Sequence, residues 1–135
     1  MSENLFGKKW TMGRALSSFS VGWNPDAEQR LYEPVGDGYK LTVTGTANGK
    51  PYEWGYTAQY DGRDHAVHGR ADADSIEAHF VNDRITIGTF KKAGRPIAFY
   101  KRTVSLDGRS LLVEMGGRSP DGGTYYHIVG YQVNS

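Results

Sequence analysis

The chain has 135 residues with 16 basic and 15 acidic side chains, a formal net charge of +1 and no cysteine. This balance excludes the one-sided basic field that nucleic-acid binding needs, and the lack of cysteine excludes disulfides, thiolate catalysis and cysteine-based zinc sites. No run approaches the roughly 20 apolar residues of a membrane span, so we expect one soluble domain over residues 1–135.

The N-terminal residues, MSENLFGKKW, lack the apolar core of a signal peptide. We therefore expect a cytoplasmic protein, or a periplasmic or secreted one if a signal peptide has been removed. The sequence predicts a first strand over residues 6–14. Residues 15–26, ALSSFSVGWNPD, are too rich in Ser, Gly and Pro for a regular helix and should form at most one helical turn, a short segment that caps one end of a barrel.

Turn signals recur about every dozen residues over the rest of the chain. They are Gly36-Asp37-Gly38, Asn48-Gly49, Asp61-Gly62, residues 69–74, Asn82-Asp83, Ala93-Gly94, Asp107-Gly108 and Asp121-Gly122-Gly123. Asn-Gly and Asp-Gly pairs between apolar runs are typical of hairpins, because the favoured two-residue turns need positive φ angles. The spacing therefore predicts an all-β fold, a single up-and-down antiparallel β-barrel of about 8–10 strands.

The strand expected over residues 52–60 has the sharpest alternation in the chain. One of its faces carries Tyr52, Trp54, Tyr56, Ala58 and Tyr60. If this face points inward, its rings could line a ligand pocket, although aromatic residues could equally fill the core of a barrel.

The last expected strand, residues 124–133, has apolar or aromatic residues on both faces. One face carries Tyr125, His127, Val129, Tyr131 and Val133. A strand that is covered on both sides suits closure of the barrel beside the N-terminal segment, or a contact between subunits. We therefore expect a monomer or a homodimer.

Several short motifs resemble those of calycin proteins, the superfamily of lipocalins and fatty-acid-binding proteins. Phe6-Gly7 with Trp10 resembles the Gly-x-Trp motif that begins the first calycin strand, although two residues, Lys8 and Lys9, separate Gly7 from Trp10. Other motifs resemble those of small bacterial lipocalin-like proteins; they are Tyr32-Glu33-Pro34, Gly36-Asp37-Gly38, Tyr60-Asp61-Gly62, Val104-Ser105 and Asp107-Gly108. The resemblance implies a barrel that holds a small, mostly apolar molecule and a structural Trp10 at its closed end. It assigns no reaction.

Two arginines could hold a ligand carboxylate, as an internal Arg and Tyr do in fatty-acid-binding proteins. Arg30 shares a strand face with Tyr32, and Arg102 shares one with Tyr100. Neither pair occupies the C-terminal position that the family uses, where this chain has Tyr131-Gln132-Val133. A surface position is the more frequent explanation for each arginine.

The four histidines offer little support for a metal site. His65 and His68 are three residues apart, and on a strand their rings point to opposite faces, so we expect two loop or edge histidines and no metal. His79 should be exposed. His127 lies among tyrosines, where it could transfer a proton or form a satisfied hydrogen bond in the core, and the second interpretation is favoured.

Two functional hypotheses follow, and neither needs a cofactor. In the first, the barrel binds a small apolar or aromatic ligand through candidate residues Tyr52, Trp54, Tyr56, Tyr60, Arg102 and Tyr125. In the second, a cofactor-independent isomerase, cyclase or lyase uses His127, Tyr131 or a buried Glu as general acid or base. The partner is a small-molecule ligand or substrate in both. Binding is favoured because no pair of a nucleophile and a base can be defended from spacing.

Overall fold

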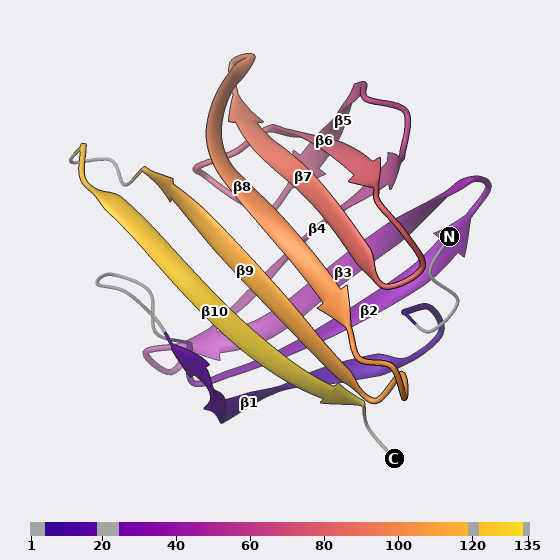
Figure 1. The fold of residues 1–135 in the computed structure, drawn as a ribbon. Helices are drawn as coiled ribbons and strands as arrows, with labels where there is room; N and C mark the ends of the chain where they lie inside the picture. The colour runs from indigo at the N-terminus through magenta and orange to yellow at the C-terminus, as the bar shows by residue number, and fades with distance from the viewer. Residues whose placement is uncertain (1–4, 19–24, 119–121, 134–135) are drawn as a thin grey trace.

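The computed structural model describes residues 5–18, 25–118 and 122–133, and within these ranges the chain forms strands and no helix. Figure 1 shows the strands in chain order. They are β1 (Lys9–Ser18), β2 (Ala27–Val35), β3 (Gly38–Ala47), β4 (Lys50–Gln59), β5 (Asp64–His68), β6 (Ser75–Phe80), β7 (Ile85–Lys92), β8 (Arg95–Val104), β9 (Ser110–Arg118) and β10 (Thr124–Val133).

The ten described strands close into one antiparallel barrel in which each strand pairs with its neighbours in sequence (Figure 1). Closure comes from β1, which pairs with β2 on one side and with β10 on the other. The predicted all-β, up-and-down barrel is therefore confirmed, with the strand number at the upper end of the expected range. No described helix has the length and apolar character needed to cross a membrane.

The N-terminal segment differs from the prediction. The first strand begins at Lys9 and continues to Ser18, so residues 15–18 belong to β1 and do not form a cap. Its pairing with β10 shifts register between Gly13 and Ser18, which lets the strand bend and continue where Ser and Gly residues suggested that it ends. The remainder of the expected cap includes residues 19–24, which lie outside the described residues.

The hairpin turns follow from residue types that tolerate positive φ. Between β3 and β4, Asn48 and Gly49 have φ angles of 53° and 75°. Two successive positive φ angles define the turn whose twist matches that of the flanking strands, and Asn-Gly is its preferred sequence. The turn signal in the sequence thus fixes the place where the chain reverses.

Alternation along β4 and β10 separates a buried face from an exposed one. On β4, Trp54, Tyr56 and Ala58 are buried, while Thr57 and Gln59 on the other face are exposed. On β10, His127 and Tyr131 are buried, with Tyr126 exposed on the opposite face. The aromatic faces seen in the sequence therefore point into the barrel.

One end of the barrel is filled by core side chains. Trp10 lies near the start of β1, is fully buried, and its Nε1 donates a hydrogen bond to the carbonyl of Leu5 at 3.1 Å. The neighbouring strands alternate in direction, so the opposite end is formed by the starts of β2, β4 and β10 and the end of β9. That opposite end holds the cavity described next.

Candidate functional site

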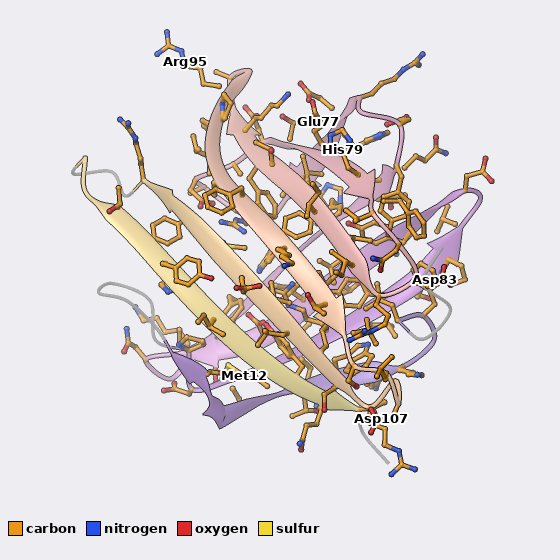
Figure 2. The ribbon with its side chains drawn as sticks, in the orientation of Figure 1. Met12, Glu77, His79, Asp83, Arg95 and Asp107 are labelled. Carbon is orange, nitrogen blue, oxygen red and sulfur yellow. The ribbon has the colours of Figure 1, made fainter. Side chains whose placement is uncertain are left out.

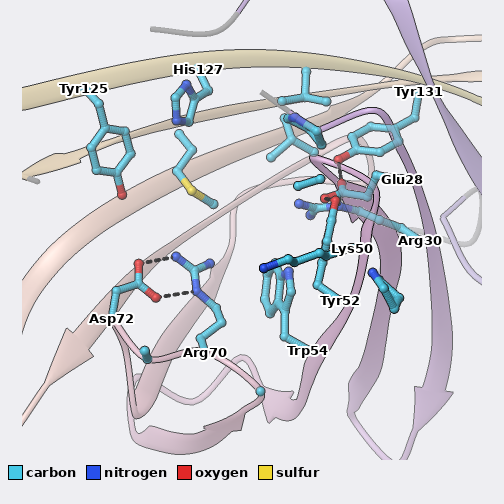
Figure 3. A pocket seen from close by; sticks show the side chains of 18 of the residues that line it. Glu28, Arg30, Lys50, Tyr52, Trp54, Arg70, Asp72, Tyr125, His127 and Tyr131 are labelled. Carbon is cyan, nitrogen blue, oxygen red and sulfur yellow. Dashed lines mark hydrogen bonds and ion pairs between the residues drawn. The ribbon is translucent and has the colours of Figure 1, made fainter. Parts of the chain in front are cut away.

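A cavity of about 620 Å³ opens at the end of the barrel away from Trp10 (Figure 3). Its lining residues come from β2, β4, β9 and β10, from the end of β3, from the loop that follows β5 and from Pro25 before β2. The larger side chains of the lining are those of Glu28, Arg30, Lys50, Tyr52, Trp54, Arg70, Asp72, Val113, Met115, Arg118, Tyr125, His127, Val129 and Tyr131. This volume lies within the range typical of pockets for small molecules.

A buried carboxylate, that of Glu28, organises the inner wall of the cavity. It is 5% exposed and pairs with Arg30, whose Nε lies 3.1 Å from Oε2. The hydroxyl of Tyr52 donates to Oε1 at 2.8 Å, and the hydroxyl of Tyr131 donates to Oε2. Arg30 also donates to the hydroxyl of Tyr32 at 3.2 Å. The negative charge is thus matched by one cation and two hydroxyl donors, which is the condition for burying it.

The two tyrosines that donate to Glu28 stay protonated. Burial is the largest cause that raises the pKa of Tyr52 and of Tyr131, and the charge of Glu28 raises both further. Each hydroxyl therefore serves as a hydrogen-bond donor to the carboxylate. Neither is a base at neutral pH.

Arginine side chains lie against the aromatic wall. The guanidinium carbon of Arg30 lies 5.6 Å from the ring centroid of Trp54 and 5.1 Å from that of Tyr131. Arg70 approaches the Trp54 ring to 4.7 Å and the Phe90 ring to 4.6 Å. Such cation–π contacts hold the guanidinium groups in fixed positions around the indole.

The loop after β5 carries a second ion pair at the mouth of the cavity. Arg70 donates from Nε and Nη2 to the two carboxylate oxygens of Asp72, an arrangement that Figure 3 shows with dashed lines. Burial opposes ionisation of Asp72, but the hydrogen bond and charge of Arg70 outweigh it and lower the pKa of that carboxyl. Both groups are therefore charged and engaged with each other.

His127 and Tyr125 form the wall opposite Arg70 and Asp72 in Figure 3. Their rings are stacked, with centroids 5.0 Å apart. Burial lowers the pKa of His127, so its imidazole is neutral at pH 7. A neutral, stacked imidazole adds polarity to this wall without adding charge.

The buried state of His127 makes the stability of the barrel depend on pH. Because its pKa is lower in the folded than in the unfolded protein, the unfolded state binds the proton first as the pH falls through about 6.5, and stability is lost. We expect His127→Phe to remove this contribution. The difference in the free energy of unfolding between variant and wild type should then be constant above neutral pH. Below neutral pH the wild type should lose stability relative to the variant. Urea denaturation across this pH range measures the difference.

The exposed His68 provides the control, since His68→Phe should leave the pH dependence of the wild type in place. A wild-type stability curve that runs parallel to that of His127→Phe at all pH values would show that His127 titrates equally in both states.

Some of the residues that the sequence predicted for the site line the cavity, and others do not. Five of them line the cavity: Tyr52, Trp54, Tyr125, His127 and Tyr131. Three do not line it: Tyr56, Tyr60 and Arg102. The expected pair of catalytic residues shares the cavity wall, but the hydroxyl of Tyr131 is donated to Glu28.

The remaining three predicted residues belong to a buried tyrosine cluster deeper in the barrel. Arg102 is 1% exposed and donates to the hydroxyls of Tyr39 at 3.3 Å and Tyr60 at 3.4 Å. The Tyr39 hydroxyl lies 2.6 Å from that of Tyr56 and 3.1 Å from that of Tyr100. Burial raises the pKa of Tyr60 to about 12. These groups form hydrogen bonds with one another away from the cavity.

The preference for surface arginines is wrong for both Arg30 and Arg102. Arg30 is 6% exposed because Glu28 neutralises it and aromatic rings cover it. Arg102 is buried in the tyrosine cluster, where hydroxyl oxygens and ring faces replace water. Both strand faces point inward, and period-two patterning alone could not assign that direction.

The other histidines lie outside the cavity. His79 is exposed and pairs with Glu77 at 2.8 Å on the outer surface (Figure 2). His65 pairs with Asp61 at 2.9 Å, and His68 is exposed. Within the described ranges, no group of three or more His, Asp or Glu side chains is arranged to hold a metal ion.

Sequence reasoning missed five charged groups of the cavity, namely Glu28, Lys50, Arg70, Asp72 and Arg118. For Glu28 a signal was present, because it lies two residues before Arg30 and therefore on the same strand face. For the other four there was none, since turn residues and strand ends gave no indication of which end of the barrel is open.

Comparisons were made with protein-family models, with curated proteins and with solved structures. None of these comparisons matches the chain to a known protein or family.

Proposed function

We propose that this protein binds a small molecule with an apolar or aromatic body in the open end of its barrel. The observation that carries the proposal is the cavity of about 620 Å³. Its apolar surface comes from Trp54, Val113, Met115 and Val129, and several of its polar groups are already held by hydrogen bonds within the protein. Sites for small molecules typically combine an apolar lining with a small number of fixed polar groups.

The state of the polar groups favours binding over acid–base catalysis. Glu28 accepts from Tyr52, Tyr131 and Arg30, so its oxygens are occupied by donors of the protein. These contacts hold the Glu28 carboxylate in place and direct both of its oxygens toward donors of the protein. The network is better suited to fixing the shape of the cavity than to moving a proton.

A larger side chain at Met115, which lines the cavity, tests the proposal. We expect the wild type to bind N-phenyl-1-naphthylamine, an uncharged fluorescent probe, with a rise in its emission, and Met115→Trp to weaken this binding by about tenfold because the indole occupies part of the cavity. Fluorescence titration gives both dissociation constants. Met115→Phe should have an intermediate effect.

Leu112→Trp is the matched control, because Leu112 lies on the same strand but is 37% exposed on the outer face. Its affinity for the probe should equal that of the wild type. Equal affinities for Met115→Trp and wild type, with both proteins folded by near-ultraviolet circular dichroism, would place the bound probe outside the cavity and refute the proposal.

A further inference from the structure

We propose that the ligand of this cavity is an amphiphilic monoanion whose apolar or aromatic body lies inside the barrel and whose carboxylate or sulfonate group lies at the mouth between Lys50 and Arg118. The inference rests on the proposed binding function and adds to it the charge of the ligand and its direction in the cavity.

The charges of the lining do not cancel. Among its described residues the cavity has four cationic side chains, those of Arg30, Lys50, Arg70 and Arg118, and two carboxylates. Arg30 is paired with one of these carboxylates at 3.1 Å, and Arg70 is paired with the other through two hydrogen bonds. Neither Lys50 nor Arg118 has an ion-pair partner among the residues that the structure describes. The positive excess therefore belongs to these two side chains.

These two cations lie at the same end of the barrel, on opposite sides of its mouth. Lys50 begins β4 and Arg118 ends β9, and four strands separate β4 from β9 in either direction around the closed barrel. Because neighbouring strands run antiparallel, the start of β4 and the end of β9 lie at the same end of the barrel. Figure 3 shows the Lys50 side chain reaching into the cavity above Trp54.

The inner part of the cavity is suited to an uncharged body. Glu28 and Arg30 neutralise each other there, and a ligand anion brought beside them would face a buried carboxylate whose charge is already matched. Val113, Met115 and Val129 give the cavity an apolar wall. An apolar or aromatic group gains from burial against these side chains, while an anionic group gains only at the mouth.

Two probes with the same aromatic skeleton separate charge from shape. N-phenyl-1-naphthylamine is uncharged, and 8-anilinonaphthalene-1-sulfonate carries one sulfonate on that skeleton. We expect Lys50→Gln/Arg118→Gln to weaken binding of the sulfonate probe by about tenfold and to change binding of the uncharged probe by less than about twofold. Raising the NaCl concentration should weaken sulfonate binding to the wild type more than to this double variant.

A matched control removes the same two charges from the other end of the barrel. Lys40→Gln/Arg109→Gln changes exposed residues near the start of β3 and in the turn before β9, and it should leave both affinities as in the wild type. A loss of sulfonate binding in this control as large as in Lys50→Gln/Arg118→Gln would assign the effect to net charge and overturn the inference.

The outcomes distinguish the two proposals. In one outcome, Met115→Trp weakens binding of the uncharged probe, but the sulfonate probe binds equally to the wild type and to Lys50→Gln/Arg118→Gln. The cavity then binds small molecules, and the anion site is refuted. If neither probe responds to Met115→Trp, the binding function fails first. Preferential loss of the sulfonate probe in Lys50→Gln/Arg118→Gln supports both.

Discussion

Replacing Glu28 with Gln is expected to lower the free energy of unfolding by about 3–5 kcal/mol, because it leaves the charge of Arg30 buried without a counter-ion. The substitution keeps the size of the side chain and an oxygen that can accept from Tyr52. It removes the negative charge that lies 3.1 Å from the Arg30 Nε, in a place where both side chains are 7% exposed or less. Urea denaturation measures the loss as a lower midpoint at unchanged slope.

Two further variants determine whether the charge is the cause. Glu33→Gln removes an exposed carboxylate from the same strand and should change the free energy of unfolding by less than about 0.5 kcal/mol. Glu28→Gln/Arg30→Met removes both charges and should be more stable than Glu28→Gln alone, since no unpaired ion remains. A double variant that is less stable than the single one would show that packing and the contacts of Arg30 matter more than its charge.

The periodicity of the sequence predicted the fold because turns and strand faces are local properties. Asn48-Gly49 adopts the two positive φ angles that its residue types favour, and Tyr56 and His127 lie on the strand faces that alternation groups together. The exception is residues 15–18, where β1 continues through Ser-rich sequence because pairing with β10 stabilises it. Pairing between distant segments is not visible in local composition.

The candidate site could be predicted only in part, because it depends on which end of the barrel is open. Tyr52 and Tyr131 were identified as aromatic residues on strand faces that could point inward, yet their shared contact with Glu28 becomes evident only when three strands meet. Tyr56 was assigned to the same site as Tyr52 from one strand face. Tyr52 and Tyr56 are four residues apart, which corresponds to about 13 Å along a strand. This distance is enough to place Tyr52 in the cavity and Tyr56 in the core behind it.

Replacing Arg102 should reveal how a cation is stabilised by aromatic side chains without a carboxylate. Within the described residues Arg102 forms no ion pair, and its Nε has no hydrogen-bond partner. Its guanidinium carbon lies 4.7 Å from the ring centroids of Tyr32 and Tyr39 and 5.4 Å from that of Tyr100. We expect Arg102→Ala to lower the free energy of unfolding by about 3–5 kcal/mol, because a large buried side chain is removed and leaves a cavity.

Arg102→Met separates the loss of packing from the loss of charge. Methionine fills much of the same space without the cost of burying an ion, and Tyr39 keeps its contacts of 2.6 Å and 3.1 Å with the hydroxyls of Tyr56 and Tyr100. We therefore expect Arg102→Met to be about 1–3 kcal/mol more stable than the wild type in urea denaturation, in contrast to Arg102→Ala. Equal destabilisation by both substitutions would mean that the ring and hydroxyl contacts of the guanidinium outweigh its desolvation, and that tyrosines alone can stabilise a buried cation in this barrel.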